Sequence, residues 1–321
     1  MIGTTNVGGG GKCIGVIYVK YKDGTICTCT CVSGSKTRVL RSNNSGEYVF
    51  NIPFESECTI SGYNFMNSAC QVSVNIYSGY GVIIDLDYII PSSYRSRYKE
   101  VEYLGFENRA NVYFPDITIE NGHSWDFEIP NLRFTASSSG YLIWTEDLTE
   151  KTQAGPEDTY IFVQRSNQAE MTATTHYGYT DVSEDNPFIE IDTDYDLLFH
   201  FSSGSGDTSL APYCLLTMND TIIATYSAER KETQPLKLFI GAAHHNNLSN
   251  GTVPTSRMSN IAVNRDSQKY TRLISCIDLN NENIPGYFDA RTNTFCQGYN
   301  GSNDSPTSVT SVLTAGKQIY Q

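Results

Sequence analysis

The chain has 321 residues, a formal net charge of −13 at pH 7 and a pI near 4.8, with 14 Phe, 22 Tyr and 2 Trp. This length predicts about two domains, and an apolar content of 39% is sufficient for buried cores. The acidic balance argues against nucleic acid as a partner, because binding to a phosphate backbone depends on Lys and Arg.

The sequence offers no candidate for a membrane-spanning segment. Its apolar runs are shorter than the roughly 20 residues that a spanning helix requires, since Asp85 and Asp87 interrupt the segment 80–90. The first residues form neither a charged n-region nor an apolar h-region, so we predict no membrane insertion and no secretion. Nine cysteines, an odd number spread unevenly, favour reduced thiols and synthesis in a cytoplasm over a disulfide framework.

The first part of the chain alternates short apolar segments with turn residues. Residues 1–12 are rich in Gly and Thr and predict a flexible linker. Residues 13–90 contain about seven expected strands at the regular turn spacing of a small immunoglobulin-like β-sandwich. The pair Asp23-Gly24 is among the turn signals. Residues 91–97 carry a proline and two arginines and predict a hinge between domains.

Three cysteines alternate along one of these segments, at Cys27, Cys29 and Cys31. Alternate residues of a strand share one face, so the three thiols are expected on the same side. The favoured interpretation is that they are small buried residues of the core, and a disulfide is an alternative. No metal is predicted, because the paired spacing of structural zinc sites is missing. A metal site would recruit further ligands from elsewhere: Cys13, Cys58 or Cys70.

Residues 98–300 predict a second, larger β domain. Strand-like alternation recurs throughout and no helical period persists; Trp125, Phe127 and Ile129, for example, share one face of their segment. About 200 residues of this kind are enough for a double-sheet jelly roll, which makes the whole chain all-β. Residues 301–321 are polar and predict a C-terminal tail.

The stretch 238–298 is expected to finish this second domain. It begins as an apolar run, breaks at Gly251 and Pro254, and returns as alternating segments. It ends in a predicted hairpin around the turn Ala290-Arg291-Thr292, with aromatic residues facing each other across two short strands.

The segment 188–201, FIEIDTDYDLLFHF, alternates polar and apolar residues. Its simplest interpretation is one long strand whose acidic face meets water. Its centre, EIDTD, is also similar to the E-x-D-x-E core of laminarinase-type glucanases, in which two carboxylates about 5–5.5 Å apart act as nucleophile and acid. Asp194 stands where that motif has Glu, so a glycoside hydrolase using Glu190 and Asp194 stays an alternative and no catalytic residue is assigned. The residues expected on the polar face are Glu190, Asp192, Asp194, Asp196 and His200.

Three landmarks distinguish residues 98–298: the opening Tyr98-x-x-Val101-Glu102-Tyr103-Leu104, the strand Leu238-Phe239-Ile240 before an Asn-rich loop, and the ending Leu273-Ile274-x-Cys276 … Gly286-x-Phe288-Asp289 … Phe295 … Gly298. With them, this part resembles the concanavalin A-like, LamG-type domains of phage and prophage tail proteins from gut Firmicutes. That ending usually has Pro before Cys and a Tyr-Asp pair, where this chain has Ser275 and Phe288-Asp289. Residues 8–90 are similar to the small β-sandwich often found before such domains.

The resemblance implies a virion structural protein: a tail fibre, receptor-binding or head-fibre component, made in the host cytoplasm. It implies other virion proteins as partners, a homo-oligomer such as a trimer, and no cofactor. The jelly roll would display loops to a host cell-surface glycan, and a bacterial cell-surface adhesin is a further alternative. The candidate ligand-binding residues are Trp144, Tyr177, Tyr179, His244, His245, Asn246 and Asn247. For the three aromatic ones, ordinary packing in the core or at its rim is the competing interpretation.

Overall fold

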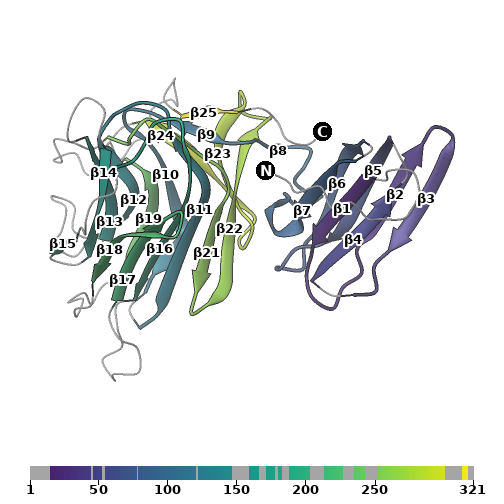
Figure 1. Ribbon diagram of the computed structural model, residues 1–321, viewed down its shortest axis with the longest axis horizontal. Helices are drawn as coiled ribbons and strands as arrows, with labels where there is room; N and C mark the ends of the chain where they lie inside the picture. Colours follow the sequence, from purple (N-terminus) through teal and green to yellow (C-terminus); the bar gives the residue numbers. More distant parts are fainter. Residues whose placement is uncertain are drawn as a thin grey trace. The chain divides into compact units, whose positions relative to one another are not determined.

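The computed structural model of the chain is built almost entirely of strands (Figure 1). It divides into two compact units, one extending to Glu100 and the other spanning Val101–Lys317. The part of the chain that the structure describes has no helix long and apolar enough to cross a membrane. The described residues are 15–44, 46–52, 55–77, 79–120, 122–146, 159–165, 171–177, 180–182, 188–202, 213–226, 235–242, 252–300 and 313–316.

Unit 1 is a two-sheet sandwich. Its described strands are β1 (Gly15–Lys20), β2 (Thr28–Ser33), β3 (Lys36–Arg41), β4 (Glu47–Ile52), β5 (Ser56–Tyr63), β6 (Ala69–Ile76) and β7 (Gly81–Asp85). One sheet has the order β4-β1-β7 and the other the order β3-β2-β5-β6. Strand β1 is antiparallel to β4 and parallel to β7. The seven strands confirm the immunoglobulin-like sandwich that the turn spacing predicts.

The core of unit 1 lies between these two sheets. Alternation along β2 turns Cys29 and Cys31 inward, while Ile17 and Val19 of β1 are buried in the same core. The predicted turn at Asp23-Gly24 is present, with Gly24 at a φ of 76°. It joins β1 of one sheet to β2 of the other, so it closes no hairpin.

Residues 91–97, which we predict as a hinge, are a series of hydrogen-bonded turns in unit 1. They follow a short 3-10 helix, η1 (Leu86–Tyr88), and precede β8 (Tyr98–Glu100). Tyr94 N donates to Pro91 O at 2.8 Å, and Arg95 Nη1 lies 2.5 Å from Glu100 Oε1. These bonds order the segment, and the second unit starts at Val101 rather than at residue 98.

Unit 2 contains the strands that follow β8. They are β9 (Leu104–Phe106), β10 (Ala110–Ile119), β11 (Ser124–Phe134), β12 (Gly140–Glu146), β13 (Thr159–Arg165), β14 (Met171–Tyr177), β15 (Thr180–Val182), β16 (Asp194–Ser202), β17 (Tyr213–Met218), β18 (Thr221–Tyr226), β19 (Leu236–Gly241), β20 (Ser256–Met258), β21 (Ile261–Arg265), β22 (Gln268–Asp278), β23 (Ile284–Asp289), β24 (Thr294–Asn300) and β25 (Leu313–Ala315).

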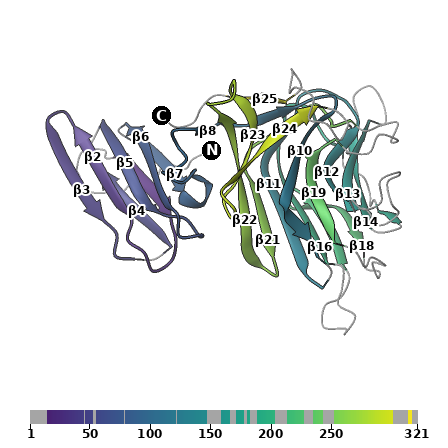
Figure 2. The ribbon, with the colours of Figure 1, turned by 180° about the vertical axis from the view of Figure 1, so that it is seen from behind.

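These strands form two sheets that share β24. The β10 sheet has the order β24-β10-β19-β12-β13-β14-β15. The β11 sheet has the order β18-β17-β16-β11-β21-β22-β23-β24, and Figure 2 shows its strands β11, β21 and β22 side by side. Strands β20, β9 and β25 continue from the end of β11. This arrangement is the predicted double-sheet jelly roll, and β25 shows that residues 313–315 of the predicted tail belong to it.

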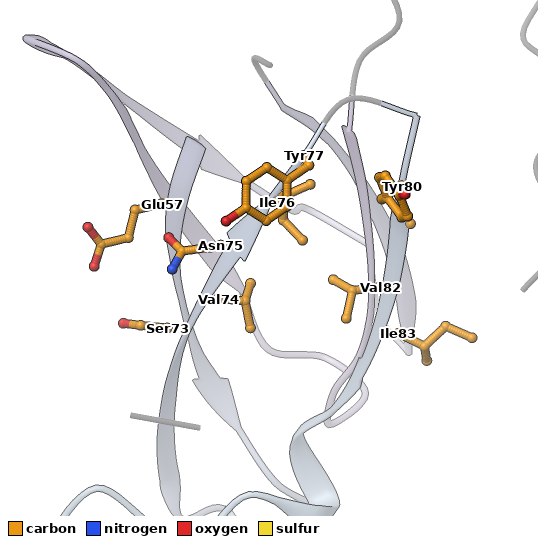
Figure 3. Close-up of a pocket in the computed structure, with 10 residues that line it drawn as sticks. Glu57, Ser73, Val74, Asn75, Ile76, Tyr77, Tyr80, Val82 and Ile83 are labelled. Atoms are coloured by element: carbon orange, nitrogen blue, oxygen red, sulfur yellow. The ribbon is translucent and has the colours of Figure 1, made fainter. Parts of the chain in front are cut away.

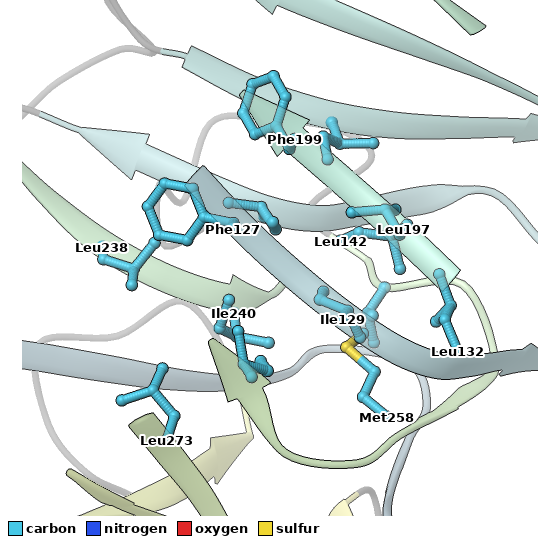
Figure 4. Packing of buried hydrophobic residues seen from close by; sticks show 14 of the residues in the cluster. Phe127, Ile129, Leu132, Leu142, Leu197, Phe199, Leu238, Ile240, Met258 and Leu273 are labelled. Carbon is cyan, nitrogen blue, oxygen red and sulfur yellow. The ribbon is translucent and has the colours of Figure 1, made fainter. Parts of the chain in front are cut away.

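The core of unit 2 lies between the two sheets (Figure 4). The predicted shared face of Trp125, Phe127 and Ile129 is confirmed, since all three are fully buried. The rings of Phe127 and Phe201 stack with centroids 5.8 Å apart, and β11 pairs with β16 along most of its length. Each such buried side chain contributes about 1.5–3 kcal/mol to the hydrophobic stabilisation.

The predicted closing hairpin is confirmed as β23 and β24, in which Phe288 and Phe295 lie directly opposite each other. Phe295 also packs over Gly286, where an added Cβ would approach its ring to 2.8 Å. Asp289 is buried and organises the turn, because its Oδ1 accepts from Thr271 Oγ1 at 2.6 Å and from Arg291 N at 2.9 Å. The aspartate of this motif is therefore a structural residue of the turn.

We expect Asp289→Ala to lower the free energy of unfolding of unit 2 by about 2–3 kcal/mol, because Thr271 Oγ1 and Arg291 N lose the carboxylate that accepts their hydrogen bonds. Asp289→Asn retains one acceptor and should cost less. Both tryptophans, Trp125 and Trp144, lie in unit 2, so tryptophan fluorescence in urea reports this unit selectively. Equal losses in the two variants would show that the acceptor atoms are not the stabilising feature.

Candidate functional site

The one predicted glycan-contacting side chain that the structure describes is buried. Trp144 lies on β12, is 0% exposed and packs edge-on against Tyr141 with centroids 4.9 Å apart. Its ring has no exposed face for a sugar, so the packing interpretation is correct for this residue. Trp144 lies on the face of the β10 sheet opposite the core between the sheets, where its register partner Phe239 stacks on Tyr113 with centroids 4.8 Å apart.

The other predicted ligand-binding residues are not brought together in the described part of the chain. Tyr177 ends β14, and its side chain lies outside the described set. Tyr179 and residues 244–247, which include His244, His245, Asn246 and Asn247, lie outside the described ranges as well. A glycan site in these loops stays a prediction.

The predicted long strand 188–201 is interrupted by a turn. Strand β16 starts only at Asp194, and Asp192 has a φ of 60°. Ile189, before the turn, forms an isolated bridge with Met171 of β14. The expectation that Glu190, Asp192 and Asp194 share one strand face is therefore wrong, because a left-handed residue separates them.

Asp194 is also neutralised by a neighbour. Arg133 Nε and Nη2 donate to its two carboxylate oxygens at 2.7 and 2.6 Å. This bidentate hydrogen bond from Arg133 lowers the pKa of Asp194. A general acid in glycoside hydrolysis needs a raised pKa instead, so the environment of Asp194 opposes that role.

A polar row crosses the outer face of the β11 sheet. Register places Asp126 directly opposite His200, and the His200 Nδ1 bonds to the Asp126 carboxylate. One position further along the face, Asn264 Nδ2 donates to Glu128 Oε1 at 2.8 Å. These groups bond to one another across paired strands.

A pocket of unit 1 lies between the edge strands β6 and β7 and has a volume of about 760 Å³. Val74 and Val82 point toward each other across it, with Tyr77 and Tyr80 at one end (Figure 3). The two tyrosines are 59% and 70% exposed. The lining is mixed, with the apolar side chains of β6 and β7 beside polar ones.

The polar side chains of this pocket lie at its rim. Glu57, Ser73 and Asn75 project from the opposite face of β5 and β6 to Val74 (Figure 3). In the described residues β6 pairs only with β5 and β7 only with β1, so one backbone edge of each is available to a ligand. Glu57 is the one charged residue among those that line the pocket.

None of the site residues predicted from the sequence lines this pocket, although the sequence contains two residues that could have indicated it. Tyr77 and Tyr80 flank the turn between β6 and β7, outside the alternation that buries aromatic residues in strands. Two exposed aromatic residues at one turn are unusual enough to mark a contact surface. Their proximity to Val82 depends on the pairing of the sandwich, which the sequence does not show.

The alternating thiols of unit 1 are on one side of their strand, as predicted, and Cys27, Cys29 and Cys31 are all buried. Cys58 of β5 joins two of them: the Sγ atoms of Cys29, Cys31 and Cys58 all lie within 4.8 Å of one another. A hydrogen bond from Cys29 lowers the pKa of the Cys58 thiol to about 7, whereas burial raises that of Cys31 to about 11. The fifth buried thiol of unit 1, Cys70, bonds separately to Ile89 O at 3.4 Å.

Neither a family model nor a curated protein matches this chain. Two solved structures are similar in fold. One is a native heptameric SAP-like pentraxin from Limulus polyphemus, with 11% identity, a TM-score of 0.37 and coverage of 51% of this chain and 76% of the pentraxin. The other is described as "a putative carbohydrate binding protein" from Bacteroides ovatus ATCC 8483, with 7% identity, a TM-score of 0.36 and coverage of 92% and 94%. Identities this low transfer no binding residue to this chain.

The geometry around Asp194 predicts that the chain does not hydrolyse laminarin, a soluble β-1,3-glucan. Incubation of the full chain should release no more reducing ends than incubation of Glu190→Gln, because Asp194 is held ionised by Arg133. A colorimetric assay of reducing sugar across pH 4–8 checks this. Hydrolysis by the unaltered chain that disappears in Glu190→Gln would contradict it.

Proposed function

We propose that this chain is a non-catalytic attachment protein of a phage virion, which binds a host cell-surface glycan. The proposal includes other virion proteins as partners, assembly as a homo-oligomer such as a trimer, and synthesis in the host cytoplasm before incorporation into the particle. Its support comes from the two β units in the order that the sequence landmarks imply, and from the environment of Asp194, which disfavours hydrolysis.

One observation carries the binding function: two exposed tyrosines stand at one end of a pocket in unit 1. A pyranose ring has apolar C–H faces and a periphery of hydroxyl groups. Tyr77 and Tyr80 offer ring faces for the first, while the unpaired backbone edges of β6 and β7 offer hydrogen-bonding groups for the second.

The charge of the site indicates which glycans it accepts. No Lys or Arg lines the pocket, Glu57 stands at its rim, and the whole chain has a net charge of −13. A sialylated or phosphorylated glycan would meet only repulsion there. We therefore propose neutral hexose or N-acetylhexosamine chains as the ligand class. The loops of the jelly roll, residues 243–251 among them, remain the second proposed recognition surface.

A second candidate function for the same pocket is docking of a strand from another virion protein. The observation that favours it is that β6 and β7 are both edge strands and flank an apolar floor formed by Val74, Ile76 and Val82. A segment added to such an edge gains main-chain hydrogen bonds, and its alternate side chains enter the pocket. A bacterial cell-surface adhesin would share the glycan chemistry but not the virion context.

We expect Tyr80→Ala to weaken glycan binding at least about tenfold, since it removes the more exposed ring of the pair. The measurement is binding of the full chain to an array of neutral and sialylated glycans, followed by titration of the best neutral ligand. Tyr63→Ala is the matched control, because Tyr63 is another exposed tyrosine of unit 1 that does not line the pocket.

Two outcomes would redirect the proposal. Equal glycan binding by Tyr80→Ala and the unaltered chain would move recognition to the jelly-roll loops. If no glycan binds, and Tyr80→Ala instead reduces incorporation into particles, the strand-docking function replaces glycan binding for this pocket. A sialylated ligand as the tightest binder would contradict the neutral-glycan assignment.

A further inference from the structure

Three thiols meet in the core of unit 1 in an arrangement that hydrophobic packing alone does not explain. Cys31 of β2 and Cys58 of β5 are directly opposite in the register, and Cys29 is the next inward residue of β2. Their Sγ atoms lie within 4.8 Å of one another, with Cys29 and Cys31 at 3.4 Å. Three sulfur atoms are thus grouped at one point, each from a paired strand that fixes its backbone.

The size of this sulfur triangle fits a bound metal ion. An ion equidistant from three sulfur atoms at about 2.3 Å stands at the centre of a triangle with edges of about 4 Å. The thiols already lie within that range, so small side-chain rotations are enough to seat the ion. The strand pairing pre-organises the ligands, which is what a metal site of defined geometry requires.

The number and kind of ligands select the ion. In the described chain, no fourth Cys, His, Asp or Glu joins the group. Structural Zn²⁺ sites take four ligands. Cu(I) is a soft ion that prefers thiol sulfur and is satisfied by two or three of them.

We propose that Cys29, Cys31 and Cys58 form a three-sulfur binding site for Cu(I) in unit 1. On binding, the S–H bond of each coordinating thiol breaks, a Cu–S bond forms in its place, and the proton passes to solvent. No electron is transferred, because the ion arrives as Cu(I).

The cluster lies near an open side of the sandwich, which gives the ion a route. Arg38 of β3 is the register neighbour of Cys31 on the other side of β2, and nearly all of β3 is exposed. Strand β3 is also an edge of its sheet. An ion therefore reaches the cluster past a single exposed strand.

The test is an anaerobic titration of the full chain with Cu(I), using a chromophoric Cu(I) chelator as competitor and native mass spectrometry for the stoichiometry. We expect one tightly bound Cu(I). Cys58→Ala and Cys31→Ala should each weaken Cu(I) binding at least about a hundredfold. This loss is larger than the loss expected when a residue that only hydrogen-bonds to a metal ligand is removed. Cys70→Ala is the matched control, because Cys70 is equally buried in the same core but outside the cluster, and it should bind normally.

X-ray absorption of the loaded, unaltered chain keeps the proposal testable even where a variant does not fold. The expected result is three sulfur atoms at about 2.3 Å from copper. Two sulfurs only, unchanged affinity in Cys58→Ala, or preference for Zn²⁺ at a four-ligand site would overturn the proposal. A mass lower by two hydrogens with no bound metal would show that a disulfide forms instead of a metal site.

Discussion

The alternation of inward and outward side chains along paired strands is the constraint on which both units depend. Because a strand turns every second residue toward the core, each pairing register decides which side chains meet. Register places Phe127 opposite Phe199 in the jelly roll and Cys58 opposite Cys31 in the sandwich. The same rule that excludes water from the cores therefore also assembles the polar row of the β11 sheet and the thiol cluster.

Local pattern predicts much of this fold. Turn spacing indicates the seven-stranded sandwich, and the hairpin with Phe288 opposite Phe295 follows from two short runs around one turn. What local pattern does not contain is pairing between distant segments. Asp126 and His200 are neighbours only through the pairing of β11 with β16. The burial of Trp144 likewise depends on strands on both sides of it, and a single residue with positive φ at Asp192 ends a strand that alternation alone would continue.

Binding and catalysis require different features of a protein surface. A general acid must hold its proton in a site where its charged form is disfavoured, yet Asp194 faces a bidentate guanidinium. A binding surface needs shape, exposed rings and unpaired backbone groups. The edges of the sandwich at β6 and β7 supply these without any strained or strongly polarised side chain.

The parallel pairing of β1 with β7 has a consequence for biosynthesis. No hairpin can create a contact between the first and last strands of unit 1, so the β4-β1-β7 sheet is completed only when β7 has left the ribosome. Until then β1 and β4 form a sheet without its third strand, and one side of the core that holds the thiols of β2 and β5 stays uncovered. Closure of this core therefore comes late in synthesis.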